Sequence, residues 1–259
     1  MTNNTDLLTD IDEDKNKSEI VVKMVHIKKS FDDNIVLRDI NLVINKGENL
    51  VVLGKSGTGK SVLIKCIVGL IAYDDGKLFL FGEDILVKKE KELIELRKKI
   101  GFLFQSGALY DSMTVRENLE FPLKRQVIKT PQNQIDLLVE EALQNVGLED
   151  TIDKMPSELS GGMRKRLGLA RTLILKPDIM LYDEPTTGLD PITSKEISTL
   201  ILEVQKKYNT SSIIITHDTD CAKITANRII IINEGICYAE GSYSELQNST
   251  DEWVRSFFA

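Results

Sequence analysis

The chain of 259 residues is long enough for one large α/β domain or for a core with an inserted subdomain. Its content of 28% charged and 42% hydrophobic residues is typical of a soluble globular protein, and a formal net charge of −7 counts against a nucleic-acid partner. No apolar run in the sequence approaches the roughly 20 residues that span a bilayer, and residues 1–19 lack the basic-then-apolar layout of a secretory signal.

Residues 1–19 are polar and acidic, so we expect a disordered acidic tail before a folded domain over residues 20–259. Apolar and β-branched residues then predict strands at 20–27 and 35–44, which form an N-terminal antiparallel β layer.

Cys66, Cys221 and Cys237 have no metal-ligand spacing and indicate a reducing, cytosolic setting, with Cys66 as a core residue.

A glycine-rich segment at residues 54–61 lies between an apolar strand at 49–53 and a helical pattern at 61–70. This context predicts a phosphate-binding loop, in which backbone N–H groups and the positive end of the helix hold the β- and γ-phosphates of a nucleotide. Glycine is expected there because a Cβ would collide with backbone or phosphate. The loop residues predicted to bind nucleotide are Gly54, Lys55, Ser56, Gly57, Thr58, Gly59, Lys60, whose amine reaches the phosphates, and Ser61, whose hydroxyl also ligates Mg²⁺.

The next elements are a strand at 77–81, a charged helix at 88–99 and a strand at 100–104. Residues 106–176 then hold helical patterns at 114–123, 132–146 and 161–175, and they predict an inserted helical subdomain. Strand and helix alternate again at 179–182, 194–207, 212–216 and 228–233, before a capping box at 242–245 and a short helix at 251–258. The predicted fold is therefore α/β, with the parallel-sheet core of a P-loop NTPase (RecA-like).

Asp183 and Glu184 follow the apolar strand at 179–182. Because ligands of parallel sheets bind beyond the carboxyl ends of the strands, this acidic pair is expected to face the phosphate-binding loop. Asp183 would hold Mg²⁺, and Glu184 would polarise the attacking water as general base. Taken alone, such a pair is common in solvated turns; the phosphate-binding loop upstream favours the functional interpretation.

A third motif is formed by Ser160, Gly161, Gly162 and Met163. Ser160 is expected to cap the helix that follows, and the two glycines leave the helix N-terminus open to a closely approaching anion. Taken alone, this motif is a serine cap with a glycine turn.

The three motifs in this order resemble those of the ABC transporter ATPases, over roughly residues 21–241. Residues 160–163 resemble the signature of that superfamily. Gln105 resembles its glutamine that contacts Mg²⁺ and the attacking water, Asp190 lies in a segment similar to its loop that crosses the dimer, His217 resembles its histidine that touches the γ-phosphate, and Phe31 resembles its aromatic residue that stacks on adenine. Alone, His217 and Phe31 would be read as an ordinary surface or core histidine and a core aromatic residue.

The resemblance implies an ATP-hydrolysing homodimer that uses ATP and Mg²⁺, with Glu184, His217 and Gln105 as catalytic residues. Each ATP would lie between the phosphate-binding loop of one subunit and Ser160, Gly161 and Gly162 of the other. Hydrolysis would then reopen the dimer and drive a separate membrane permease.

Most members of the superfamily have Gln where this chain has Met163. That Met, with residues 103–109, 155–162 and 254–258, resembles the Mla (maintenance of lipid asymmetry) ATPases. This finer resemblance implies phospholipid transport between membranes, a complex with permease subunits and a lipid-binding MCE-type subunit, and a peripheral place on the cytoplasmic side of the inner membrane. Some relatives bind a small STAS-domain regulator, a partner that the resemblance leaves open.

Three alternatives remain to be weighed. An ABC ATPase for another cargo, such as amino-acid import or lipoprotein release, is disfavoured by Met163. A translation-type or DNA-repair ABC ATPase usually has two ATPase domains or a long coiled coil, and neither pattern is present in the sequence. A purely regulatory nucleotide-binding module would lack the catalytic acid, whereas Glu184 is present.

Overall fold

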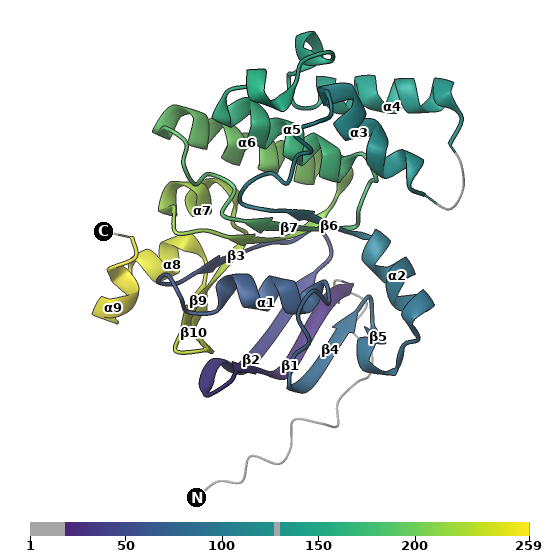
Figure 1. Cartoon of the computed structure of the whole chain (residues 1–259). Coiled ribbons are helices and arrows are strands. Elements are labelled where there is room, and N and C mark those ends of the chain that lie inside the picture. Colours follow the sequence, from purple (N-terminus) through teal and green to yellow (C-terminus); the bar gives the residue numbers. More distant parts are fainter. Residues whose placement is uncertain (1–18, 127–129, 259) are drawn as a thin grey trace, which may run out of the picture.

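The computed structural model describes residues 19–126 and 130–258, and Figure 1 shows their arrangement. The chain begins with an antiparallel layer: β1 (Ile20–Phe31) pairs with both β2 (Asn34–Asn45) and β4 (Asp75–Leu80), and β5 (Glu83–Asp84) follows at the edge. Along β1 the buried Val22 and Met24 alternate with the exposed Lys23, which is the period of a strand with one covered face. The expected N-terminal antiparallel layer is therefore confirmed.

A parallel sheet forms the centre of the molecule. Its order is β9 (Arg228–Asn233), β3 (Asn49–Leu53), β8 (Ser211–Ile215), β7 (Ile179–Asp183) and β6 (Ile100–Leu103). Every residue of β3, β7 and β8 is buried, as expected for strands that are covered on both faces. The α/β fold with a parallel core is confirmed.

One strand at the edge of the parallel core was not predicted. β10 (Ile236–Gly241) pairs antiparallel with β9 and touches β2 through Ile236 and Asp39, so it joins the two parts of the sheet. None of its residues is buried, and for that reason its sequence carries no strong apolar signal.

The two faces of the parallel sheet pack against different partners (Figure 1). Leu50 and Val52 of β3 pack with α1 (Lys60–Ile67) and the antiparallel layer, and Cys66 lies fully buried in this cluster. Val51 and Leu53 belong to the opposite cluster, to which α5 (Gly161–Leu173), α6 (Pro191–Tyr208) and α7 (Thr219–Thr225) contribute. Alternation along one strand thus builds two cores, one on each face.

The described residues between 106 and 176 contain helices and no strand, as predicted. They form α3 (Val115–Lys124), α4 (Gln132–Gln144), α5 and the short 3₁₀ helices Glu149–Thr151 and Pro156–Glu158. Thr114 and Glu117 form a capping box at the start of α3, where the Thr114 hydroxyl accepts from the Glu117 N–H at 3.2 Å and the Glu117 carboxylate accepts from the Thr114 N–H at 2.8 Å.

The remaining elements lie at the edges. A 3₁₀ helix (Ile85–Val87) and α2 (Glu90–Lys98) precede β6, and α8 (Tyr243–Gln247) and α9 (Glu252–Arg255) follow β10. The predicted helix at 251–258 is shorter than expected, and the one at 61–70 ends at Ile67, before Gly69 at φ +70°.

Among the described helices, none has the length and apolarity required to cross a membrane. The expected acidic tail lies outside the described residues, apart from Glu19.

Candidate nucleotide-binding site

The glycine-rich segment forms a loop between β3 and the N-terminus of α1. Gly54 has φ +155°, and a Cβ built on it would lie 2.6 Å from the carbonyl oxygen of Ile232 on β9. Gly57 has φ +83° with open space around its Cβ position, so its requirement within the protein is conformational; a collision with backbone is absent there, and the predicted collision with phosphate stays a prediction. α1 has no side-chain cap, so its first N–H groups remain available to an anion.

Lys60 is buried at the start of α1 and its ammonium group turns back onto the loop. Nζ donates to the carbonyl oxygen of Gly54 at 2.7 Å and to that of Lys55 at 2.9 Å. Burial lowers the pKa of Lys60, and the carboxylates of Glu184 and Asp183 oppose that shift. A further hydrogen bond within the loop comes from the Thr58 hydroxyl, which donates to the Lys55 carbonyl oxygen at 2.9 Å. These contacts place a positive charge inside the phosphate-binding loop.

Ser61 and Asp183 meet where β7 ends. The Ser61 hydroxyl donates to Asp183 Oδ1 at 2.9 Å, and Asp183 is 8% exposed. A hydroxyl and a carboxylate are hard oxygen donors, and Mg²⁺ sites typically combine one or two carboxylates with waters and substrate phosphates. The two side chains therefore fit a magnesium ion bound together with nucleotide. Gln105, which follows β6, lines the same cleft.

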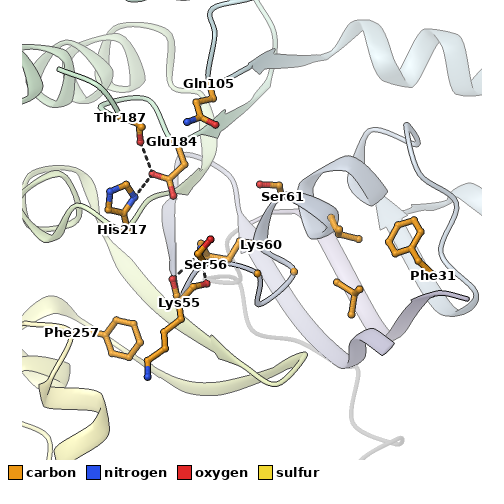
Figure 2. Close-up of a pocket in the computed structure, with 15 residues that line it drawn as sticks. Phe31, Lys55, Ser56, Lys60, Ser61, Gln105, Glu184, Thr187, His217 and Phe257 are labelled. Atoms are coloured by element: carbon orange, nitrogen blue, oxygen red, sulfur yellow. Dashed lines mark hydrogen bonds and ion pairs between the residues drawn. The ribbon is translucent and has the colours of Figure 1, made fainter. Parts of the chain in front are cut away.

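Glu184 follows Asp183 and adopts φ +53°, a left-handed conformation that is uncommon for a residue with a Cβ. Its N–H donates to the carbonyl oxygen of Ile215 at 2.9 Å, which holds this turn against the end of β8. The side chain is held as well: Oε2 lies 2.8 Å from Nδ1 of His217 and accepts from the Thr187 hydroxyl at 3.0 Å (Figure 2). Thr187 was not predicted as a site residue.

Most of these groups line one cleft of about 800 Å³, whereas Thr58 and Asp183 are not among its lining residues. Figure 2 shows Phe31 on one side of the phosphate-binding loop and Phe257 on the other. Phe31 is 43% exposed, with Lys29 Nζ 5.1 Å from its ring centroid, so it is not a core aromatic residue. Phe257 follows α9 and was not predicted, because nothing in the local sequence places it at the cleft. The other lining residues are Val36, Gly54, Lys55, Ser56, Gly57, Gly59, Lys60, Ser61, Val62, Gln105, Glu184, Thr187 and His217.

The Ser160 motif lies on a second surface. Ser160 Oγ accepts from the N–H of Met163 at 3.2 Å, which is the predicted cap of α5. Gly162 packs against α6, where a Cβ on Gly162 would lie 2.5 Å from Thr193 Cγ2. Asp190 caps α6 and accepts from the Thr193 hydroxyl at 2.6 Å; this bond and those to the helix N–H groups lower the pKa of Asp190.

The structure thus divides the predicted site residues into two groups. Within the described chain, Ser160, Gly161, Gly162 and Asp190 do not line the cleft that contains the phosphate-binding loop. Gly161 also lies near this second group, with its Cβ position 3.5 Å from Leu189 Cδ2. The two motifs at the N-termini of α5 and α6 therefore form one continuous surface.

The parallel sheet, the loop ahead of α1 and the acidic residues at the end of β7 define a P-loop ATPase of the α/β class. A family model described as ABC transporter matches residues 37–187, which is more than half of the chain. The chain belongs to the ABC transporter family and is an ATPase subunit of that family.

Two curated relatives and one solved structure illustrate the similarity. The chain is 39% identical to "Probable ribonucleotide transport ATP-binding protein mkl" of Mycobacterium leprae (strain TN), over 92% of this chain and 68% of that protein. It is 38% identical to "Intermembrane phospholipid transport system ATP-binding protein MlaF" of Haemophilus influenzae (strain Rd), over 93% of this chain and 90% of that protein. The expected closeness to the Mla ATPases is confirmed.

The solved structure is described as the dimeric structure of a post-hydrolysis state of the ATP-binding cassette MJ0796 bound to ADP and Pi. It superposes with a TM-score of 0.77 at 30% identity and covers 86% of this chain and 98% of that chain. The expected P-loop NTPase fold is therefore confirmed by a nucleotide-binding relative.

Proposed function

We propose that this chain binds and hydrolyses ATP to power phospholipid transport between membranes through a separate permease. The observation that supports this cargo is Met163 in the motif that caps α5, together with similarity to the phospholipid-transport ATPase over 90% of that protein's length. The lipid would not touch this chain, so the cargo rests on family similarity and the ATPase chemistry rests on the cleft.

In the proposed mechanism, residues 54–61 hold the phosphates with backbone N–H groups, and the Lys60 ammonium neutralises part of their charge. Ser61 and Asp183, with Gln105 nearby, would hold Mg²⁺, which supplies charge neutralisation at the transferring phosphoryl group. Phe31 would contact the adenine face at the edge of the cleft.

Glu184 is the proposed general base. Its Oε2 is fixed by His217 and Thr187, so the other carboxylate oxygen can accept a hydrogen bond from the attacking water. Fixing the carboxylate reduces the reorganisation that the reaction needs, and in-line attack on the γ-phosphate depends on such positioning.

A second copy of the chain would complete each site. The surface formed by Ser160, Gly161, Gly162 and Asp190 lies apart from the cleft of its own subunit, and the N-terminus of the 13-residue α5 favours an anion. In a head-to-tail homodimer this surface would face the nucleotide of the partner subunit. The dimeric state of the ADP-bound relative supports this arrangement.

The complex would lie on the cytoplasmic side of the inner membrane, with this chain as a peripheral subunit. Residues 106–176 would act as a helical subdomain that transmits the closing of the dimer to permease subunits. An MCE-type lipid-binding subunit would receive or deliver the lipid, a STAS-domain regulator would be an additional partner, and nucleic acid would not be one.

A second candidate is an ABC ATPase with another cargo, such as an amino acid, a ribonucleotide or a released lipoprotein. Its support is the mkl relative, which is named for ribonucleotide transport and is as similar in identity as the phospholipid-transport relative. Both candidates share the same ATPase cleft and differ only in the partners on the membrane.

The deciding experiment is affinity purification of the full chain from native membranes in mild detergent, with mass spectrometry of proteins and lipids. Co-purification of a permease, a lipid-binding MCE-type subunit and bound phospholipid is the expected result. A permease with a solute-binding protein would retain the ATPase role and overturn the lipid cargo. Recovery of ribosomes or DNA-bound proteins without a permease would overturn the transporter role.

A further inference from the structure

Lys165 is a buried lysine whose contacts lie outside its own helix. It belongs to α5, five residues after Ser160, and it is only 8% exposed. Its ammonium group donates to the carbonyl oxygen of Gln105 and, at 3.3 Å, to that of Glu184. One side chain therefore joins the helix that begins at the Ser160 motif to the backbone of two residues at the ATP cleft.

The neighbours of Lys165 in the sequence make a different kind of contact. Arg164 donates to the carbonyl oxygen of Leu159 at 2.8 Å, next to the start of its own helix. Arg166 donates to the carbonyl oxygen of Val146 at 3.0 Å and pairs with Glu196 at 2.9 Å. Arg164 thus closes the start of α5 and Arg166 links α5 to the end of α4 and to α6, whereas Lys165 reaches the ends of β6 and β7.

The position of Lys165 has an energetic cost. A buried ammonium is rarely found unless it is paired or donates hydrogen bonds, because it loses its hydration. Two carbonyl oxygens partly replace that hydration here, and such charge-assisted bonds are stronger than neutral ones. A methionine, which is of similar length, would fill much of this volume without the desolvation cost, so packing alone does not account for lysine at this position.

Glu184 is one of the two residues whose backbone this contact holds. Its φ of +53° is a strained conformation that persists only when surrounding contacts hold it. The N–H of Glu184 is held by Ile215, and its carboxylate by His217 and Thr187. Lys165 adds a hydrogen bond to the carbonyl oxygen and thus fixes the peptide plane from which the side chain projects.

We propose that Lys165 is a positioning residue for ATP hydrolysis, which couples the position of α5 to the backbone of Gln105 and Glu184. Movement of α5, whose N-terminus would contact the nucleotide of the partner subunit, would then displace Glu184, the general base of the same subunit as α5. This inference rests on the proposed roles of Glu184 and Gln105 in the cleft.

The test compares Lys165→Gln, Lys165→Met and Lys165→Arg in the full chain, both alone and in the membrane complex recovered with it. Lys206→Gln is the matched control, because Lys206 is an exposed lysine on α6. We measure kcat and KM for ATP hydrolysis, the Kd for ATP, and the melting temperature of each variant.

We expect Lys165→Gln and Lys165→Met to lower kcat by about tenfold to a hundredfold, with the Kd for ATP changed by less than about threefold. Arginine keeps the charge and can donate to both carbonyl oxygens, so Lys165→Arg should retain kcat within about fivefold. Lys206→Gln should match the wild type. Should Lys165→Met fail to fold, the comparison of Lys165→Gln with Lys165→Arg decides the matter.

Two outcomes would overturn the inference. In one, Lys165→Gln keeps the wild-type kcat. In the other, kcat falls only in proportion to a lower melting temperature and weaker ATP binding, which is the signature of a packing role. Glu184→Gln, measured in parallel, separates this failure from that of the proposed function: if Glu184→Gln retains full ATPase activity, the proposed base is wrong irrespective of Lys165.

Discussion

Nδ1 of His217 lies 2.8 Å from Oε2 of Glu184, although 33 residues separate the two in the chain. The parallel strands β7 and β8 bring them together, because both residues follow the carboxyl ends of neighbouring strands. His217 is largely exposed and Glu184 is half-buried, so the contact forms at the wall of the cleft. It restrains the carboxylate of Glu184 and leaves one oxygen for water.

Replacing Glu184 with Gln should lower kcat by about 10²–10⁴, because an amide cannot accept a proton from the attacking water. ATP binding should persist, since the phosphate contacts come from residues 54–61, and the variant should accumulate as an ATP-bound dimer. Phosphate release and size-exclusion chromatography with ATP measure the two effects. Glu203→Gln, which changes an exposed carboxylate on α6, is the control. Near-normal turnover in Glu184→Gln would remove Glu184 as the base.

Replacing Lys60 with Ala should weaken ATP binding by about tenfold to a hundredfold, because a hydrogen bond to a charged group contributes roughly 1.5–3 kcal/mol. Titration with a fluorescent ATP analogue measures the Kd, and Lys206→Ala controls for the loss of an exposed lysine. An unchanged Kd would show that the ammonium, which now contacts the carbonyls of Gly54 and Lys55, does not engage the phosphates.

Two glycines of the phosphate-binding loop should differ in their tolerance of alanine. Gly57→Ala introduces only the left-handed strain of about 1–2 kcal/mol and should lower the melting temperature by about 2–8 °C. Gly54→Ala adds a Cβ that would lie 2.6 Å from the Ile232 carbonyl oxygen, so the loop must move and the loss should be larger. Differential scanning fluorimetry without nucleotide compares them. Equal losses would mean that the loop relaxes freely away from β9.

Replacing Phe31 with Ala should raise the Kd for ATP by about fivefold to a hundredfold, because stacking of a base on an aromatic side chain contributes roughly 1–3 kcal/mol. The affinity for inorganic tripolyphosphate, which has no base, should stay the same. Phe257→Ala is the comparison, since Phe257 lines the same cleft. If Phe257→Ala weakens ATP binding more than Phe31→Ala does, adenine contacts Phe257 and the proposed contact with Phe31 is wrong.

Much of the fold could be predicted from local pattern. The strands β3, β7 and β8 are continuously apolar, and the helices of residues 106–176 show the helical period, so both were found. β10 was missed because none of its residues is buried, and α7, with seven residues, was missed because it is too short for a clear period.

The sequence by itself determined the motifs whose residues are neighbours in the chain: the phosphate-binding loop, the acidic pair after β7 and the Ser160 cap of α5. A strand, a glycine turn and a helix N-terminus create such a site from local backbone geometry, so spacing alone predicts it. Even there, the open space at Gly57 became visible only in the structure.

Only the tertiary structure decided which distant groups meet. Thr187 and His217 converge on Glu184, Phe257 reaches the cleft from the end of the chain, and Lys165 crosses from α5 to the carbonyl oxygens of Gln105 and Glu184. These contacts depend on how strands and helices pack across the two cores. A hydrogen bond needs its donor and acceptor atoms placed about 2.7–3.2 Å apart, and no sequence period specifies positions to a few tenths of an ångström.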